Sequence, residues 1–233
     1  GYPFASHIFA DLSGQRMHFI DEGPADAPVL LMLHGNPTWS YFFRALISGL
    51  RDRYRCIAPD HIGMGLSSRP DDDEYPFTCA RRARDIAALL DHLSIDSPVT
   101  LILHDWGGMI GMTYASQHPE RIAGLVALNT GAFELPNDTG VAWQIRAFRS
   151  WLGPALIAGA NAFCRGAARW CAREPLRGEV RRAYLAPYAR WRDRKAVLRF
   201  VQDIPITPDD PGFAQLKAVE ASFTAFRNIP APV

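Results

Sequence analysis

Two short junctions in this sequence combine residue types that could form a catalytic site. The first runs from Leu33 to Thr38 and reads LHGNPT, and the second runs from Leu103 to Gly108 and reads LHDWGG. Each follows a short apolar segment, and open α/β sheets bind their ligands at the carboxyl ends of strands. The second junction has the strand, sharp turn and helix order of a nucleophile elbow, which places Asp105 at the nucleophile position.

Asp105 could act as a nucleophile, because a carboxylate can displace a leaving group at a saturated carbon and form an ester that water later cleaves. The backbone amides of Asn36 and Trp106 are the two donors that this geometry assigns to an oxyanion hole. The indole N–H of Trp106 and the side-chain amide of Asn36 are neutral donors that could hold the released anion. Structural alternatives exist, because an Asp before a helix is often an N-cap and a buried Trp often donates to a carbonyl. The joint presence of both junctions favours catalysis.

The elements that must position these residues alternate between short β-rich segments and helical segments from residue 15 to 129, which is typical of an α/β protein. We expect strands over 17–21, 29–33, 55–59, 99–104 and 122–129, and helices over 41–51, 79–93 and 106–117. After Asn129 the sequence becomes helical, aromatic and rich in Arg. We therefore expect an α/β core over 1–130, a helical cap over 131–211, and over 212–233 a return helix and the start of another core strand.

Composition narrows the possible functions. With 233 residues, 48% hydrophobic and 21% charged, the chain can bury one sizeable core. A net charge of +1 gives no whole-chain footprint for binding nucleic acid. The longest apolar run, 152–163, is broken by Gly and Pro and is shorter than the roughly 20 residues that span a bilayer. The spacing of the four cysteines indicates no metal site, so we expect neither metal nor cofactor, and a cytoplasmic location.

On these motifs the sequence resembles the haloalkane dehalogenases of the α/β-hydrolase superfamily. The similarity extends over nearly the whole chain and includes 34–40, 59–67, 104–108 and 128–130. Segments 184–188 and 199–205 make it most similar to the third subfamily, which also contains the cis-β-lactone decarboxylases of bacterial olefin biosynthesis. The resemblance implies a mostly parallel sheet with helices on both faces and a helical cap. It also implies Asp105 as the nucleophile, with the side chains of Asn36 and Trp106 holding the leaving halide or carboxylate.

The chain departs from the family pattern at the general base and its acid. Hydrolysis of the ester normally uses a His oriented by a carboxylate. The last of the seven histidines, His118, ends the helix that Asp105 begins, about 20 Å away at 1.5 Å per residue. Asn129 stands where some relatives carry a catalytic Glu, and Glu134 is a weak substitute. We therefore expect the triad His and acid beyond Val233, and part of the core to be missing. His34 and His104 are expected to stabilise the two turns by hydrogen bonds.

The cap carries an unusual charge. Residues 141–200 hold 13 Lys or Arg and 3 Asp or Glu, a net charge of +10. This face is either simply solvated or contacts an acidic partner protein or an anionic membrane surface. Apolar cap residues either line a hydrophobic pocket or attach the cap to the core, and they are Trp143, Phe148, Trp151, Leu152, Leu156, Ile157 and Phe163.

The sequence therefore predicts an enzyme with an Asp nucleophile that cleaves the carbon–halogen bond of a small apolar haloalkane through an alkyl-enzyme ester and releases a halide ion. A cis-β-lactone, which would lose carbon dioxide to give an alkene, is the alternative substrate. An epoxide hydrolase would use the cap tyrosines Tyr184 and Tyr188 as acids, but Asn36 is typical of dehalogenases. A non-catalytic α/β-hydrolase scaffold is the remaining alternative. It is supported only by the lack of a histidine that could act as the general base.

Overall fold

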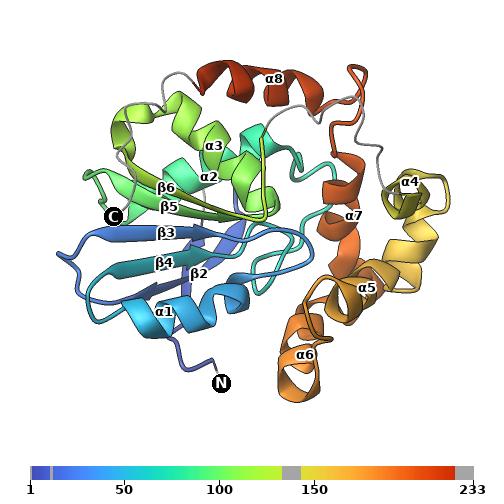
Figure 1. Ribbon diagram of the computed structural model, residues 1–233, viewed down its shortest axis with the longest axis horizontal. Coiled ribbons are helices and arrows are strands. Elements are labelled where there is room, and N and C mark those ends of the chain that lie inside the picture. The colour runs from blue at the N-terminus through green and yellow to red at the C-terminus, as the bar shows by residue number, and fades with distance from the viewer. Residues whose placement is uncertain (1, 11–12, 133–142, 224–233) are drawn as a thin grey trace.

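A six-stranded sheet forms the centre of the computed structural model, which describes residues 2–10, 13–132 and 143–223 (Figure 1). The strands follow the order β1, β2, β4, β3, β5 and β6 across the sheet. The last four are parallel, whereas β2 runs antiparallel to both β1 and β4. Their bounds are β1 His7–Ala10, β2 Arg16–Glu22, β3 Val29–Leu33, β4 Arg55–Pro59, β5 Val99–His104 and β6 Ile122–Leu128.

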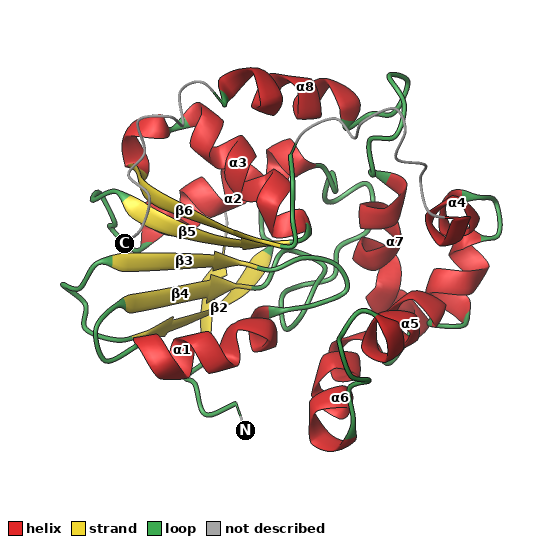
Figure 2. Ribbon diagram, viewed as in Figure 1, coloured by secondary structure: helices red, strands yellow, loops and turns green. Residues whose placement is uncertain are grey.

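Helices cover both faces of this sheet (Figure 2). Leu30 and Met32 of β3 point to one face, where Ile47 of α1 (Arg44–Leu50) packs with them. Leu31 and Leu33 point to the other face, in the cluster formed with α2 (Cys79–His92) and α3 (Trp106–Gln117). Alternate residues of a strand face opposite sides, so a strand covered on both sides is apolar throughout, as the fully buried β3 is.

Four further helices, with short connecting turns, lie beyond the carboxyl ends of the parallel strands (Figure 1). They are α4 Trp143–Arg149, α5 Ala162–Trp170, α6 Gly178–Leu185 and α7 Lys195–Gln202, and residues 143–202 are called the cap from here on. After the cap, α8 (Phe213–Ser222) packs against α3. Among the described residues, no helix is long and apolar enough to cross a membrane.

Hydrogen bonds join the cap to the loop that follows β3. The indole Nε1 of Trp39 donates to the carbonyl oxygen of Ala183 over 3.1 Å, and the hydroxyl of Tyr188 donates to the carbonyl oxygen of Thr38 over 2.7 Å. Arg69, on the core side, donates to the carbonyl oxygen of Pro187 over 2.7 Å. The cap is therefore fixed directly above one of the two predicted catalytic junctions.

The expected strands and core helices are confirmed with small shifts in their ends. The helix expected over 41–51 begins as a 3₁₀ turn, Ser40–Phe43, before α1. β6 ends at Leu128 rather than Asn129, because Asn129 takes a left-handed backbone conformation with φ of 45°. β1 was not predicted. The division into core, cap and return helix, and the missing C-terminal part of the core, stay predictions.

Candidate active site

The elbow predicted at Asp105 is present. Asp105 is the single residue between the end of β5 at His104 and the start of α3 at Trp106. Its φ and ψ are 52° and −125°, a conformation that non-glycine residues rarely adopt and that functional sites often contain. Asp105 occupies the N-cap position of α3, but its side chain makes no capping hydrogen bond there. No capping hydrogen bond therefore supports the helix-capping alternative, and the role of Asp105 as nucleophile stays a prediction.

Glycines allow the three loops at this edge of the sheet to approach closely. A Cβ atom on Gly107 would lie 1.9 Å from the carbonyl oxygen of Leu33, and one on Gly35 would lie 2.2 Å from Oδ1 of Asp105. Neither position has room for a side chain. The loop after β3 can thus lie directly against the nucleophile elbow. From the other side, the hydroxyl of Thr130 donates a hydrogen bond of 2.5 Å to the carbonyl oxygen of Asp105.

One of the two predicted oxyanion donors contacts the carboxylate of Asp105 directly. The backbone N–H of Asn36 donates to Oδ1 over 2.7 Å. Burial raises the pKa of Asp105, while hydrogen bonds from the backbone amides of Asn36 and Trp106 act in the opposite direction. The net pKa lies above the ordinary value for Asp. A poorly solvated carboxylate of this kind is a better nucleophile than a hydrated one, and its amide partners remain in place to hold the charge that develops later.

Two buried histidines hold the loop that carries Asn36. The backbone N–H of His61 donates to Nε2 of His34 over 3.1 Å, and Nε2 of His61 donates to the carbonyl oxygen of His34 over 3.1 Å. His34 in turn donates from Nδ1 to the carbonyl oxygen of Gly35. Burial lowers the pKa of both histidines, which disfavours the charged form of each ring. The prediction for His34 is confirmed, and His61 is a positioning residue that the sequence did not reveal.

The contacts of His104 differ from the predicted turn-stabilising hydrogen bond. Its ring stacks on Phe42, with ring centres 4.0 Å apart, and its Nδ1 atom has no hydrogen-bond partner among the described residues. The prediction of a turn-stabilising hydrogen bond is therefore not met at that atom. Burial lowers the pKa of His104, and the charge of Asp105 opposes that shift. The stacked ring beside the elbow contributes packing to the turn.

The side chain of Asn36 connects the core to the cap. Its Nδ2 atom donates to the carbonyl oxygen of Val197 in α7 over 3.1 Å, whereas its Oδ1 atom is buried and accepts no hydrogen bond from a described residue. An amide nitrogen carries two hydrogens, so one remains for a leaving anion. The predicted role of this side chain in holding an anion is compatible with the geometry and stays a prediction.

The indole of Trp106 packs against Phe200 of α7, with ring centres 5.2 Å apart. The indole N–H makes no hydrogen bond to any residue in the described ranges, which sets aside the structural alternative that it donates to a carbonyl. On another side of Phe200, the guanidinium of buried Arg82 lies 3.8 Å from the ring centre. Neither Phe200 nor Arg82 was predicted, because no local pattern links α2 to a helix more than a hundred residues later.

The cap residues fall into two groups. Ile157 is buried, and Phe148 packs edge-to-face on Phe163 with ring centres 5.2 Å apart. Trp143 and Trp151 instead expose 73% and 87% of their surface, so here they neither line a pocket nor attach the cap. Glu134, the weak candidate for the acid, lies outside the described residues.

The cap tyrosines are already engaged in structural contacts. The hydroxyl of Tyr188 donates to the carbonyl oxygen of Thr38, and Tyr184 packs edge-to-face on Tyr41. Burial raises the pKa of both phenols. Tyr188 in particular has no free proton to give to an epoxide oxygen, which argues against the epoxide hydrolase alternative. Within the described part of the chain, no group of three or more His, Cys, Asp or Glu residues is placed to hold a metal ion.

A mostly parallel sheet, helices on both faces and a nucleophile elbow after a central strand define an enzyme of the α/β-hydrolase class. A family model described as "alpha/beta hydrolase fold" matches residues 28–160. The chain therefore belongs to the α/β-hydrolase fold family, and the fold implied by the sequence resemblance is confirmed.

Relatives within this family show which enzymes the chain is similar to. It is 45% identical to the cis-3-alkyl-4-alkyloxetan-2-one decarboxylase of Xanthomonas campestris pv. campestris, over 99% of this chain and 79% of that one. It is 38% identical to the haloalkane dehalogenase of Mycobacterium marinum, over 94% of this chain and 72% of that one. Among solved structures, a loop variant of a haloalkane dehalogenase from Bradyrhizobium elkanii matches with a TM-score of 0.84 and 30% identity, over 98% of this chain and 78% of that one.

Proposed function

We propose that this enzyme uses Asp105 to displace halide from the saturated carbon of a small apolar haloalkane. The observation that carries the proposal is the placement of the Asp105 carboxylate at the elbow, buried and hydrogen-bonded through Oδ1 to the backbone N–H of Asn36. One carboxylate oxygen is thereby held, and the other can attack. The relatives named as haloalkane dehalogenases support the same reaction class.

The first step forms a bond between Oδ2 of Asp105 and the substrate carbon while the carbon–halogen bond breaks and its electron pair leaves with the halide. The indole N–H of Trp106 and the second amide hydrogen of Asn36 would hold that halide. In the second step, water adds to the ester carbonyl carbon of Asp105 and the alcohol leaves. Because Oδ1 is then the ester carbonyl oxygen, the negative charge develops on the atom that accepts the hydrogen bond from Asn36. Attack by water needs a general base, for which the triad His and acid beyond Val233 stay a prediction.

A second candidate reaction is the conversion of a cis-β-lactone to an alkene and carbon dioxide. The observation that favours it is the 45% identity to the Xanthomonas protein, an enzyme named for an oxetan-2-one, which is a β-lactone. The same carboxylate and the same donors would serve it, since the leaving group in this case is also anionic. Both candidate reactions would use the same dehalogenase-like site, and they differ in the substrate that enters it.

The experiment that tests both is a side-by-side turnover assay of the full-length protein on 1-bromobutane and on a long-chain cis-β-lactone. Bromide and butanol report the first reaction, and alkene reports the second. Asp105→Asn should abolish both, because the nearly isosteric amide is far less nucleophilic. Turnover by this variant, with deamidation back to Asp excluded by mass spectrometry, would contradict the assignment of Asp105.

The exposed residues of the cap indicate which kind of partner this protein could bind. Four tryptophans of the cap are each more than 60% exposed, namely Trp143, Trp151, Trp170 and Trp191. Exposed Trp together with many Arg residues supports contact with an anionic membrane surface, since both residue types are favoured at membrane interfaces. An acidic partner protein would also match the charge. This contact and a cytoplasmic location stay predictions.

A further inference from the structure

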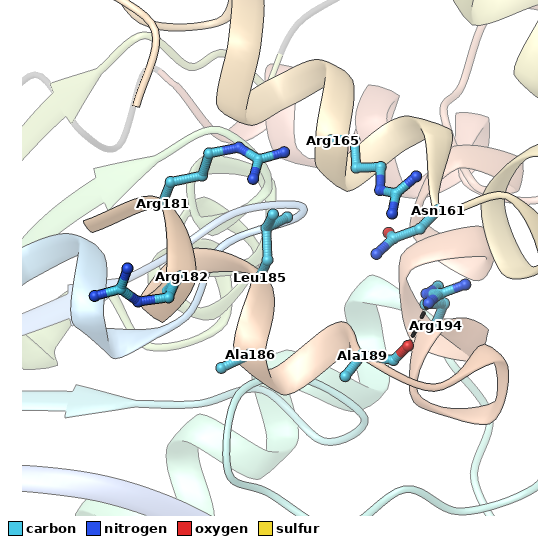
Figure 3. Close-up of a pocket in the computed structure, with 8 residues that line it drawn as sticks. All are labelled: Asn161, Arg165, Arg181, Arg182, Leu185, Ala186, Ala189 and Arg194. Carbon is cyan, nitrogen blue, oxygen red and sulfur yellow. Dashed lines mark hydrogen bonds between the residues drawn. The ribbon is translucent and has the colours of Figure 1, made fainter. Parts of the chain in front are cut away.

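The cap contains a hollow of about 310 Å³ between α5 and α6, and none of the residues assigned to the reaction lines it (Figure 3). Arg165 and Asn161 come from one side, Arg181, Arg182 and Leu185 come from α6, and Arg194 lies at its base. The volume is at the lower end of the range for small-molecule sites. No part of the proposed reaction uses these residues.

The base of the hollow holds a buried positive charge. Arg194 is 7% exposed, and its guanidinium donates to the carbonyl oxygens of Tyr188, Ala158, Gly159 and Ala189 at 2.6–3.1 Å. These carbonyls satisfy its hydrogen-bonding groups, but they are neutral. Arg194 makes no ion pair within the described ranges. A buried cation without a counter-ion favours an anion nearby.

A buried hydrogen-bond acceptor lies beside that charge. Asn161 is 7% exposed, and its Nδ2 atom donates to the carbonyl oxygen of Tyr188 over 3.2 Å. Because a carbonyl can only accept, this contact fixes which end of the amide is nitrogen. The other end, Oδ1, is buried and has no hydrogen-bond partner in the part of the chain that the structure describes. A buried acceptor without a partner is costly, so the site is prepared for a ligand that brings an O–H or N–H donor.

The rim of the hollow adds exposed guanidinium groups. Arg165 and Arg181 make no ion pair to any residue that the structure describes, and Arg182 is 3.9 Å from Glu179, with both side chains largely exposed. By contrast, Arg199 at the boundary between cap and core is paired with a carboxylate. Its Nε and Nη2 atoms donate to Asp72 over 2.8 and 2.6 Å. The arginines around the hollow therefore have positive charge available for a ligand.

We propose that this hollow binds a phosphate monoester whose organic part carries a hydroxyl or amide donor. Near neutral pH such a phosphate carries close to two negative charges and three acceptor oxygens, which suits guanidinium groups on opposite walls. Its donor group would meet Oδ1 of Asn161, and its carbon chain would lie on Leu185. A carboxylate offers one charge and two oxygens and would leave part of the positive charge uncompensated. The ester could be a soluble metabolite or a lipid headgroup.

Isothermal titration of the full-length protein with glycerol 3-phosphate tests the proposal. We expect saturable binding that weakens at least tenfold in the double variant Arg165→Ala/Arg181→Ala. The matched control is Arg169→Ala/Arg173→Ala, which removes the same charge from two exposed positions outside the hollow and should change binding less than twofold. Equal weakening in both double variants would reduce the effect to general electrostatics and overturn the proposal, as would the absence of binding.

The role of Asn161 is tested by comparing glycerol 3-phosphate with methyl phosphate, which has the same charge and no hydroxyl. One neutral hydrogen bond corresponds to roughly a fivefold difference in affinity. Asn161→Gly keeps a residue suited to the left-handed backbone at this position, where φ is 55°, and should remove that difference. Circular dichroism of the variant checks its fold. An unchanged difference, or succinate binding as tightly as glycerol 3-phosphate, would contradict the phosphate ester assignment.

The source of the ester is decided by a second arm. Phosphatidylcholine vesicles are offered with and without lysophosphatidic acid, which presents the same glycerol phosphate group on a lipid. Sedimentation of the protein with the loaded vesicles, lost in Arg165→Ala/Arg181→Ala, indicates a lipid headgroup. Binding of free glycerol 3-phosphate without vesicle binding indicates a soluble ligand. Vesicle binding that the double variant retains would place the membrane contact elsewhere on the cap and count against the hollow.

Discussion

The carbonyl oxygen of Val197, in α7 of the cap, accepts a hydrogen bond of 3.1 Å from the side-chain amide of Asn36. The backbone N–H of the same Asn36 donates to Asp105 over 2.7 Å. One residue thus contacts both the proposed nucleophile and a helix of the cap. The position of the cap and the geometry of the oxyanion loop are therefore linked through Asn36.

Substitution of Asn36 should consequently affect both catalysis and stability. In Asn36→Ala the backbone donor to Asp105 remains, but the bond to Val197 and the donor for the anion are lost. We expect a fall in turnover together with a loss of about 1 kcal/mol in the free energy of unfolding, as for one net hydrogen bond. Steady-state kinetics and urea titration measure the two effects. A large kinetic defect with unchanged stability would show that the contact to Val197 contributes nothing.

Trp106→Phe should separate these two effects. Phenylalanine keeps an aromatic ring against Phe200, but it removes the N–H and part of the volume of the indole. The N–H makes no hydrogen bond to another described residue, so dehalogenation should slow by roughly 10²-fold, as for the loss of one oxyanion-type donor, without a comparable loss of stability. Bromide release and thermal melting check this. Parallel losses in rate and Tm would instead assign the indole a structural role.

The raised pKa of Asp105 predicts the acid limit of the proposed reaction. In that reaction the carboxylate is the nucleophile, so kcat/KM should fall as pH decreases through a pKa above the ordinary value for Asp. The folded state binds this proton more tightly than the unfolded state, so ionised Asp105 lowers stability at neutral pH. Asp105→Asn should therefore be at least as stable as the parent protein at pH 7. This difference in the free energy of unfolding should disappear below the pKa that Asp105 has in the unfolded chain. A less stable variant at pH 7 would contradict this balance.

The close approach at Gly107 predicts that a substitution there lowers stability, and a second glycine provides the control. In Gly107→Ala the new Cβ would meet the carbonyl oxygen of Leu33 at 1.9 Å, and backbone has to move to relieve it. We expect a loss of about 2 kcal/mol or more, in the range of strained or overpacked positions. Gly49→Ala in α1, where a Cβ meets nothing within 4 Å, should be neutral or slightly stabilising. Chemical denaturation of the two variants gives the comparison.

The central strands could be predicted because a strand covered on both faces is nearly continuous in apolar residues, as β3 is. β1 could not, because three of its four residues are exposed and no hydrophobic periodicity remains. The Asp105 elbow was predictable from a local motif of strand, turn and glycines. The contacts of Phe200 with Trp106 and Arg82 depend on the placement of the cap, which local sequence does not encode. The exposure of Trp151 was missed for the same reason, since it also depends on how the cap is placed.

Three core side chains attach to the cap at main-chain atoms, namely the carbonyl oxygens of Ala183, Pro187 and Val197. Every amino acid has that carbonyl, so most substitutions at these three positions keep the attachment. A substitution at any of these positions changes the side chain without removing the hydrogen-bond acceptor. The cap can therefore vary in sequence at these points while it stays joined to the core.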